Sequence, residues 1–146
     1  MTSPEQQPIT GREAVADTRT PHAALVHFCR AFNDRDIAEM EKNREQSPGI
    51  VMDNPFGGIK RGWNEIQEVY ARIFGGTAKV YVEHYDYTIH NHGAMFNAVG
   101  GERSRFEKGG LTIYLAIRTS RIFRDTPEGR KQVRHHGSVE DPAPLD

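Results

Sequence analysis

A chain of 146 residues can bury one good core but is too short for two ordinary domains, so the sequence predicts a single domain. Its 19 basic and 20 acidic residues give a formal charge of -1, which argues against a general affinity for nucleic acid or membrane surfaces. No apolar run approaches the roughly 20 residues of a membrane helix, and the polar N-terminus does not resemble a targeting segment, so we expect a cytoplasmic protein.

The first helix is predicted to follow a loose N-terminal segment. Residues 1–19 contain little apolar material, which is typical of a flexible arm. Thr20 then suits an N-cap and Pro21 the first helical position. The apolar stripe of this helix consists of Leu25, Phe28, Cys29 and Phe32. The lone cysteine cannot form an internal disulfide, and its position on the stripe favours a buried, inert thiol.

Two further helices flank a short strand. Asp36 and Glu39 have the spacing of a capping box and predict a short second helix. Residues 50–52 look like a short strand, and a long helix is predicted to begin at Gly62. Its apolar residues recur on one face, and the Gly75-Gly76 pair marks its end.

The second half of the chain predicts four strands. Residues 79–89 and 94–101 read as two strands, and 103–109 as a charged connection. The segment 110–138 then forms a long hairpin, with a cluster of turn residues at 125–129. Its first strand is too long to lie flat in a domain of this size, so we expect the sheet to bend and to leave a concave face.

Helices that precede strands in this way are typical of an α+β fold, a curved antiparallel sheet with two to three N-terminal helices covering its concave face. The predicted domain spans residues 20–142, and 143–146 form an irregular tail. A partly covered concave sheet is also a candidate small-molecule pocket.

Several short motifs resemble the SnoaL-like branch of the nuclear transport factor 2-like (NTF2-like) superfamily. They are residues 53–58, 61–63, 69–76, 118–121 and 132–138. This resemblance covers about 21–142 and implies a cone-shaped α+β barrel. The superfamily includes ketosteroid isomerase and scytalone dehydratase, but also the purely structural association domain of calcium/calmodulin-dependent kinase II, which the closing hairpin resembles. Lys131 and Arg134 replace a Trp and the first of three His that the branch usually carries.

Two residues are candidates for acid/base chemistry. His135 shares a strand face with Val133, the apolar residue that should point to the concave side, so it is expected in the pocket. Asp53 ends a short strand, where the resemblance implies a pocket acid, and a desolvated carboxylate could act as a base. Each also has a structural explanation, His135 as a hydrogen-bonded core residue and Asp53 as turn chemistry.

Four residues are candidates for ligand contact. Tyr70 lies on a helix stripe and Trp63 at the start of that helix, where either could line the cavity or belong to the core. Arg121 should enter the cavity and pair with Glu102 or Asp53, most simply as a structural ion pair. Because no His/Cys set has metal-ligand spacing, neither a metal nor another cofactor is expected.

The outer face of the sheet suits an interface. Tyr114, Arg118 and Ser120 alternate with the inward residues of the long strand, giving a face too apolar for open water and too polar for a core. The sequence, with the family resemblance, predicts a two-fold homodimer through this face.

Three functions stay open at this point. The chain could be a cofactor-free isomerase, dehydratase or hydrolase acting on a small apolar or carbonyl-containing molecule, with Asp53 as base and His135 or Tyr70 as acid or oxyanion donor. It could instead bind such a molecule without catalysis, or serve as a dimeric assembly module.

Overall fold

The computed structural model describes residues 6–141, which form three helices and one six-stranded sheet. The elements are α1 (Pro21–Asn33), α2 (Ile37–Asn43), β1 (Val51–Asp53), β2 (Ile59–Arg61), α3 (Gly62–Gly75), β3 (Lys79–His92), β4 (Met95–Lys108), β5 (Leu111–Thr126) and β6 (Gly129–Val139). The predicted α+β order is confirmed. Within residues 6–141, no helix is both long and apolar enough to cross a membrane.

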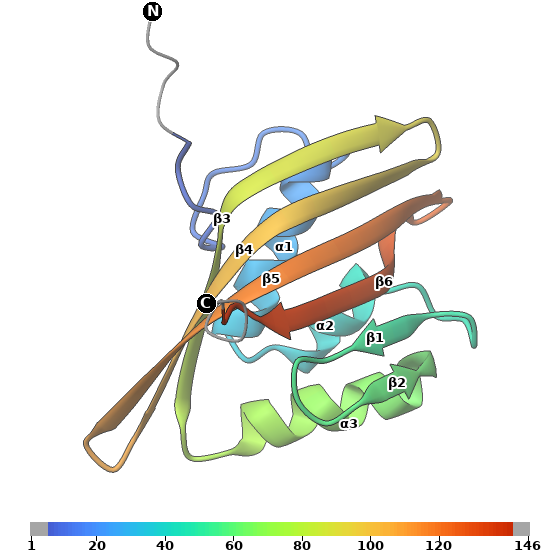
Figure 1. Cartoon of the computed structure of the whole chain (residues 1–146). Helices are drawn as coiled ribbons and strands as arrows, with labels where there is room; N and C mark the ends of the chain where they lie inside the picture. The colour runs from blue at the N-terminus through green and yellow to red at the C-terminus, as the bar shows by residue number, and fades with distance from the viewer. Residues whose placement is uncertain (1–5, 142–146) are drawn as a thin grey trace, which may run out of the picture.

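The strands lie in the order β2-β1-β6-β5-β4-β3. The sheet is mixed, not purely antiparallel as expected, because β1 runs parallel to β6. Figure 1 shows α1 and α2 behind the sheet and α3 along the edge formed by β1 and β2. The helices therefore cover one face of the sheet, here called the inner face, and leave the outer face open.

The predicted N-cap residues of α1 and α2 are confirmed, but the capping box predicted for α2 is not formed. The Thr20 hydroxyl accepts a hydrogen bond from the amide of Ala23 at 3.1 Å, which caps α1. The Asp36 carboxylate likewise accepts from the amide of Glu39 at 3.1 Å. Glu39 does not complete the capping box, because its carboxylate bonds His27 at 2.9 Å instead.

The predicted charged connection at 103–109 is wrong, since these residues continue β4 to Lys108 and the hairpin turns at Gly109-Gly110. Their charges are accommodated on the sheet surface. Arg103 pairs with Glu83 at 2.9 Å, and its guanidinium lies 4.0 Å from the ring centroid of Tyr85. Charged residues can thus remain in strand conformation, and the β4–β5 hairpin protrudes from the domain (Figure 1).

The N-terminal segment also departs from its prediction. Ile9 is fully buried, and its backbone exchanges two hydrogen bonds with His84, at 2.8 and 2.9 Å. Gly11 lies directly against the backbone of Arg30 in α1. Part of the expected flexible arm is therefore an integral part of the domain, while the predicted tail at 143–146 falls outside the described residues.

The apolar core lies between α1 and the inner face. The rings of Phe96 and Phe123 stack there with centroids 4.7 Å apart, and Leu25 and Phe28 of α1 belong to the same buried cluster. Cys29 is buried in this cluster as predicted, and burial raises the pKa of its thiol far above the ordinary value. This thiol is therefore not a nucleophile at neutral pH.

Candidate functional site

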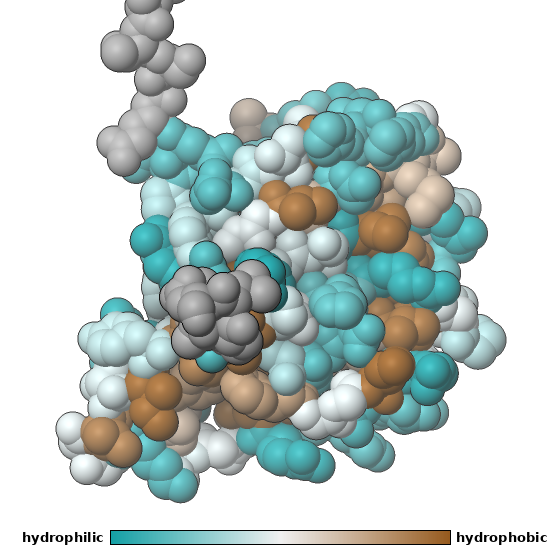
Figure 2. Space-filling view, in the orientation of Figure 1, coloured by the Kyte–Doolittle hydropathy of each residue, from teal (hydrophilic) through white to brown (hydrophobic). Residues whose placement is uncertain are grey.

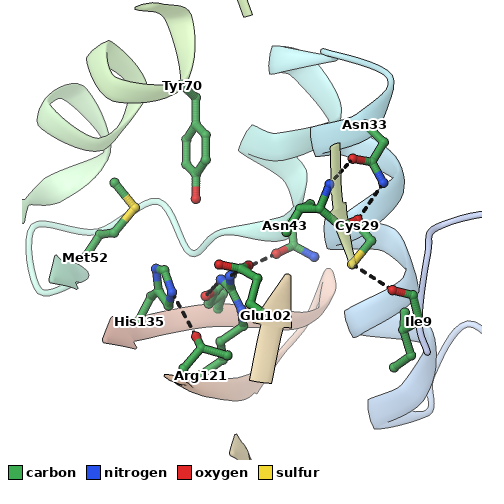
Figure 3. A network of polar contacts seen from close by, with 12 residues as sticks. Ile9, Cys29, Asn33, Asn43, Met52, Tyr70, Glu102, Arg121 and His135 are labelled. Atoms are coloured by element: carbon green, nitrogen blue, oxygen red, sulfur yellow. Dashed lines mark hydrogen bonds and ion pairs between the residues drawn. The ribbon is translucent and has the colours of Figure 1, made fainter. Parts of the chain in front are cut away.

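Polar side chains gather between the inner face and the helices, where a core would ordinarily be apolar (Figure 3). We call this cluster the polar interior. It consists of the buried residues Asn43, Arg44, Tyr70, His84, Glu102, Thr119, Arg121, Gln132 and His135.

The centre of the polar interior is an ion pair. Arg121 of β5 donates to the Glu102 carboxylate of β4 at 2.9 Å, which confirms one of the two pairings predicted for it. It also donates to the side-chain oxygen of Gln132 at 2.8 Å, and its guanidinium lies 3.8 Å from the ring centroid of Phe28. The paired charges and the stacked ring hold Arg121 in one orientation.

A hydrogen-bonded chain connects this pair to the surface. The Gln132 amide donates to the side-chain oxygen of Asn43 at 3.1 Å, and the Asn43 amide lies 3.1 Å from Nδ1 of His27. The other ring nitrogen of His27 contacts Glu39. The chain thus links β5 and β6 to α1 and α2 and fixes the helices on the sheet.

A β-bulge in β6 places Gln132 and His135 on the same side of the strand. Phe123 pairs with Gln132 and Ile122 pairs with Arg134, so Val133 has no partner on β5. Because Val133 is the extra residue of the bulge, Gln132 and His135 both face inward although they are three residues apart, and both are buried. The predicted inward position of His135 is confirmed, because Val133 is half-buried and packs against the core as expected, and the bulge adds the buried Gln132 to the same face.

The His135 ring is held at one nitrogen only. Its Nε2 lies 3.0 Å from the hydroxyl of Thr119, while Nδ1 is buried without a hydrogen-bond partner. Burial, followed by the nearby positive charge of Arg121, holds the pKa of His135 well below its ordinary value. The imidazole is therefore neutral at neutral pH, and its Nδ1 can accept a proton in one tautomer or donate one in the other.

Arg44 and Tyr70 meet on the helix side of the interior. Arg44 follows α2, and its Nη2 donates to the Tyr70 hydroxyl at 2.5 Å and lies 3.6 Å from the sulfur of Met52. Figure 3 shows the Tyr70 ring extending from α3 toward the side where Glu102, Arg121 and His135 lie. Tyr70 is therefore buried with its hydroxyl directed inward, while Trp63 is buried at the start of the same helix with its Nε1 unpartnered.

His84 of β3 is a second buried histidine. It stacks on Phe28 with ring centroids 5.8 Å apart, and neither ring nitrogen has a partner. Desolvation, followed by the charge of Arg121, holds its pKa well below the ordinary value. The interior therefore contains two neutral imidazoles.

Asp53 lies on the opposite face of the sheet from His135. The register pairs Met52 with His135 and Asp53 with His136, so the predicted pairing of Asp53 with His135 is wrong. The Asp53 carboxylate lies 3.2 Å from Nδ1 of His136, and the two side chains are 36% and 63% exposed. Because neighbours in register share a face, the carboxylate cannot act with His135 on one substrate.

Within residues 6–141, the cavity found beside this cluster is too small for a ligand. The cavity next to Arg121, His84 and Thr119 has about 10 Å³, the space of roughly one water molecule. The expected open pocket on the concave face is therefore filled by its own side chains. A groove of about 740 Å³ does exist, but it lies outside, between α1, α2 and the β5–β6 turn.

Two further predictions can be compared with the structure. Tyr114, Arg118 and Ser120 are exposed on the outer face, and Tyr114 is 74% exposed. Among residues 6–141, no three His, Cys, Asp or Glu side chains form a group that could hold a metal ion.

Sequence reasoning missed part of the interior. His84 alternates with Val82 on a strand, so the period-two pattern could have placed both on the inner face. The inward position of Gln132 depends on the bulge, and no residue pattern in the sequence indicates that bulge. Arg44 lies in a polar stretch after α2 that resembles an exposed loop, and nothing in the sequence suggests its burial.

Comparison with known proteins identifies related folds. A family model described as the SnoaL-like domain matches residues 22–142. No curated protein sequence matches the chain. A candidate dehydratase of the NTF2-like family from Streptomyces avermitilis superposes with a TM-score of 0.73 at 18% identity, covering 80% of this chain and 91% of that one.

Two other solved structures share the fold. A ketosteroid isomerase-like protein from Erwinia carotovora gives a TM-score of 0.68 at 18% identity over 88% of this chain and 100% of that one. A candidate calcium/calmodulin-dependent protein kinase type II association domain from Thiobacillus denitrificans gives 0.67 at 19% identity, over 84% and 96%. At these identities the likeness establishes the fold and leaves the activity open.

Proposed function

Because this chain belongs to the SnoaL-like domain family, we propose that it is a cofactor-free enzyme that moves protons on a small carbonyl-containing molecule bound in the polar interior. The resemblance to the NTF2-like superfamily seen in the sequence motifs is confirmed. One observation carries the proposal: His135 is buried, neutral and fixed through Nε2, with Nδ1 unpartnered.

In this proposal His135 replaces Asp53 as the base. A neutral imidazole with a low pKa is present in its basic form at neutral pH, and Thr119 fixes the ring orientation. Proton abstraction next to a carbonyl places negative charge on the carbonyl oxygen. Arg44 and the Tyr70 hydroxyl are donors that could stabilise this charge, since both are buried and already oriented.

Access to the filled interior requires a covering element to move, and α3 is the best candidate. Only Trp63, Ile66 and Tyr70 of its 14 residues are buried, whereas α1 buries seven of 13. Displacing α3 therefore exposes less apolar surface than displacing α1. Such a movement would withdraw Tyr70 from Arg44 and open the side of the interior that leads to His135.

Deuterium exchange tests this function because it reports proton abstraction directly, whatever the complete reaction is. The protein is incubated in heavy water with a panel of small ketones, enones and keto acids, and exchange next to the carbonyl is followed by NMR. We expect the wild type to accelerate exchange of at least one compound, and His135→Gln to lower that rate by about 100-fold or more.

Asp53→Asn is the matched control for this assay. Because Asp53 lies on the outer side of β1, we expect its variant to exchange at the wild-type rate. A compound that binds the wild type without any exchange would contradict catalysis and favour the alternative of a binding protein. Equal exchange by wild type and His135→Gln would remove His135 as the base.

We also propose that the chain forms a homodimer through the outer face of the sheet. Figure 2 shows apolar areas interrupted by polar ones on this side and at the protruding hairpin. Met95, Val99 and Tyr114 are between 40% and 74% exposed on this face, and Arg118 is exposed on the same face. Isolated exposed apolar residues are ordinary, but a row of them along adjacent strands suits contact with a second copy.

A further inference from the structure

Arg44 is a buried cation without an anionic partner. It is 1% exposed, and within residues 6–141 its guanidinium contacts the hydroxyl and ring of Tyr70 and the sulfur of Met52. Neither Tyr70 nor Met52 carries a charge. Its Nε and Nη1 are buried and have no hydrogen-bond partner. An arginine stays protonated under essentially all conditions in proteins, so these two groups are unsatisfied donors next to a full positive charge.

The charges of the polar interior do not balance. Its two cations are Arg44 and Arg121, and its one carboxylate, Glu102, is bound to Arg121 at 2.9 Å. The two buried histidines are neutral at neutral pH and add no charge. Within residues 6–141, the interior therefore carries one positive charge in excess, located at Arg44.

An unpaired buried charge of this kind destabilises the folded protein. A buried charge that lacks a counter-ion costs several kcal/mol, and native structures almost always pair it. Replacement by an apolar residue of similar length would remove this cost, yet the chain keeps an arginine there. Unpartnered donors on a fixed guanidinium are also the arrangement that recognises anions elsewhere in proteins.

We propose that Arg44 binds a small monovalent anion inside the cone, with the Tyr70 hydroxyl as a second donor. This inference rests on the proposed function and names the substrate class, a small molecule with a carboxylate or enolate oxygen at Arg44. A free halide ion presents the same chemistry to the guanidinium. In either case the anion neutralises the interior and satisfies Nη1 and Nε.

Thermal unfolding in chloride-free buffer tests the site. Sodium chloride, formate, acetate and propionate are titrated separately at constant ionic strength, which is maintained with sodium sulfate. We expect at least one anion to raise the Tm of the wild type by about 3 °C in a saturable manner, because a ligand that binds only the folded state stabilises it. Carboxylates that bind more tightly as they lengthen would identify an organic acid, and preference for chloride would identify a halide site.

Arg44→Met separates this site from general salt effects. We expect this variant to lose the saturable response, and its Tm without added anion to equal or exceed that of the wild type. Arg72→Met, which removes an exposed arginine outside the proposed interface, is the matched control and should respond as the wild type does. Tyr70→Phe should weaken anion binding about tenfold without abolishing it. A saturable response retained by Arg44→Met would overturn the proposal.

A bromide derivative gives a readout that needs no variant. Crystals grown in sodium bromide should show an anomalous peak within hydrogen-bonding distance of the Arg44 guanidinium, and absence of that peak together with an unresponsive wild type would overturn the proposal. The outcome is independent of the proton-exchange assay. Loss of exchange in His135→Gln with anion binding intact would support both proposals. No exchange in the wild type with anion binding intact would reject the proposed catalysis alone.

Discussion

At the residue scale, the polar interior contains groups whose charged forms are destabilised by burial, and the fold excludes water from them. Two imidazoles are buried without partners on at least one nitrogen each, and both have pKa values far below the ordinary histidine value. Such groups are stable inside the fold only while neutral. The polar interior therefore makes the stability of the protein depend on pH.

We predict that acid destabilises the fold beginning near pH 6.5. A histidine with a lowered folded-state pKa is neutral in both states above about 6.5, so it has no effect there. Below that pH the unfolded chain binds protons that the folded chain does not, and stability falls. Between pH 7.5 and 5.5, each buried histidine should cost about 1.4 kcal/mol of unfolding free energy, measured with urea.

His84→Phe should remove one of these contributions. The variant keeps a ring stacked on Phe28 but cannot take up a proton, so its loss between the two pH values should be about 1.4 kcal/mol smaller than that of the wild type. His92→Gln, at an exposed position, is the control and should retain the wild-type loss. An unchanged loss in His84→Phe would mean that His84 is not held neutral.

The residue scale is also where prediction from the sequence fails most. Alternation along β5 correctly directs Arg121 inward, because an unbroken strand preserves its period of two. The same rule correctly assigns His135 to the interior by way of Val133, which packs against the core, but it does not predict that a bulge at Val133 also turns Gln132 inward. The pairing of Asp53 with His135 depends on the family resemblance, which carries no information on register.

At the element scale, the N-terminal segment shows how a short stretch can belong to the fold without a regular pattern. Residues 6–19 contain few apolar side chains, yet Ile9 fills a place in the core and adds a bridge to β3. A single buried residue leaves no periodicity that a sequence could reveal. By contrast, α1 and α3 have clear apolar stripes, and α1 is also capped by Thr20, so the positions of both helices were predictable.

Gly11→Ala tests whether this segment is integral. Gly11 has a φ of 91°, and an added Cβ would lie 2.5 Å from the backbone nitrogen of Arg30. Gly57 has a φ of 92° with nothing within 4 Å of its Cβ position, so Gly57→Ala carries the backbone strain alone. We expect Gly11→Ala to lose about 2 kcal/mol more unfolding free energy than Gly57→Ala. Equal losses would indicate that the segment is loosely attached.

At the scale of the whole molecule, α+β architecture and helix coverage follow from the order of helices and strands, and the sequence was sufficient to predict them. Whether the covered face contains a pocket was not predictable, because it depends on how side chains from β3 to β6 fill the space. The structure places the buried side chains of Arg121, Glu102, Gln132 and His135 there, and the cavity beside Arg121 has about 10 Å³. Ligand binding must therefore involve movement of an element, for which α3 is our proposal.

Arg118→Glu tests the proposed association through the outer face. In a two-fold dimer this change places carboxylates on both copies in the interface, so we expect at least a tenfold weaker association by sedimentation. Arg72→Glu makes the same charge change on the exposed side of α3 and should not alter the association. A wild type that sediments as a monomer, or equal behaviour of the two variants, would contradict the proposed interface.

The most direct test of the central claim is a measurement of the His135 ring by long-range 1H–15N NMR between pH 6 and 8. We predict a neutral imidazole throughout, with one protonated nitrogen and no titration near pH 6.5, because the ring is buried beside Arg121. This result would establish that His135 is buried in its neutral, basic form. A titration midpoint near 6.5 would show that His135 is open to water, and it would contradict the closed polar interior as the site of chemistry.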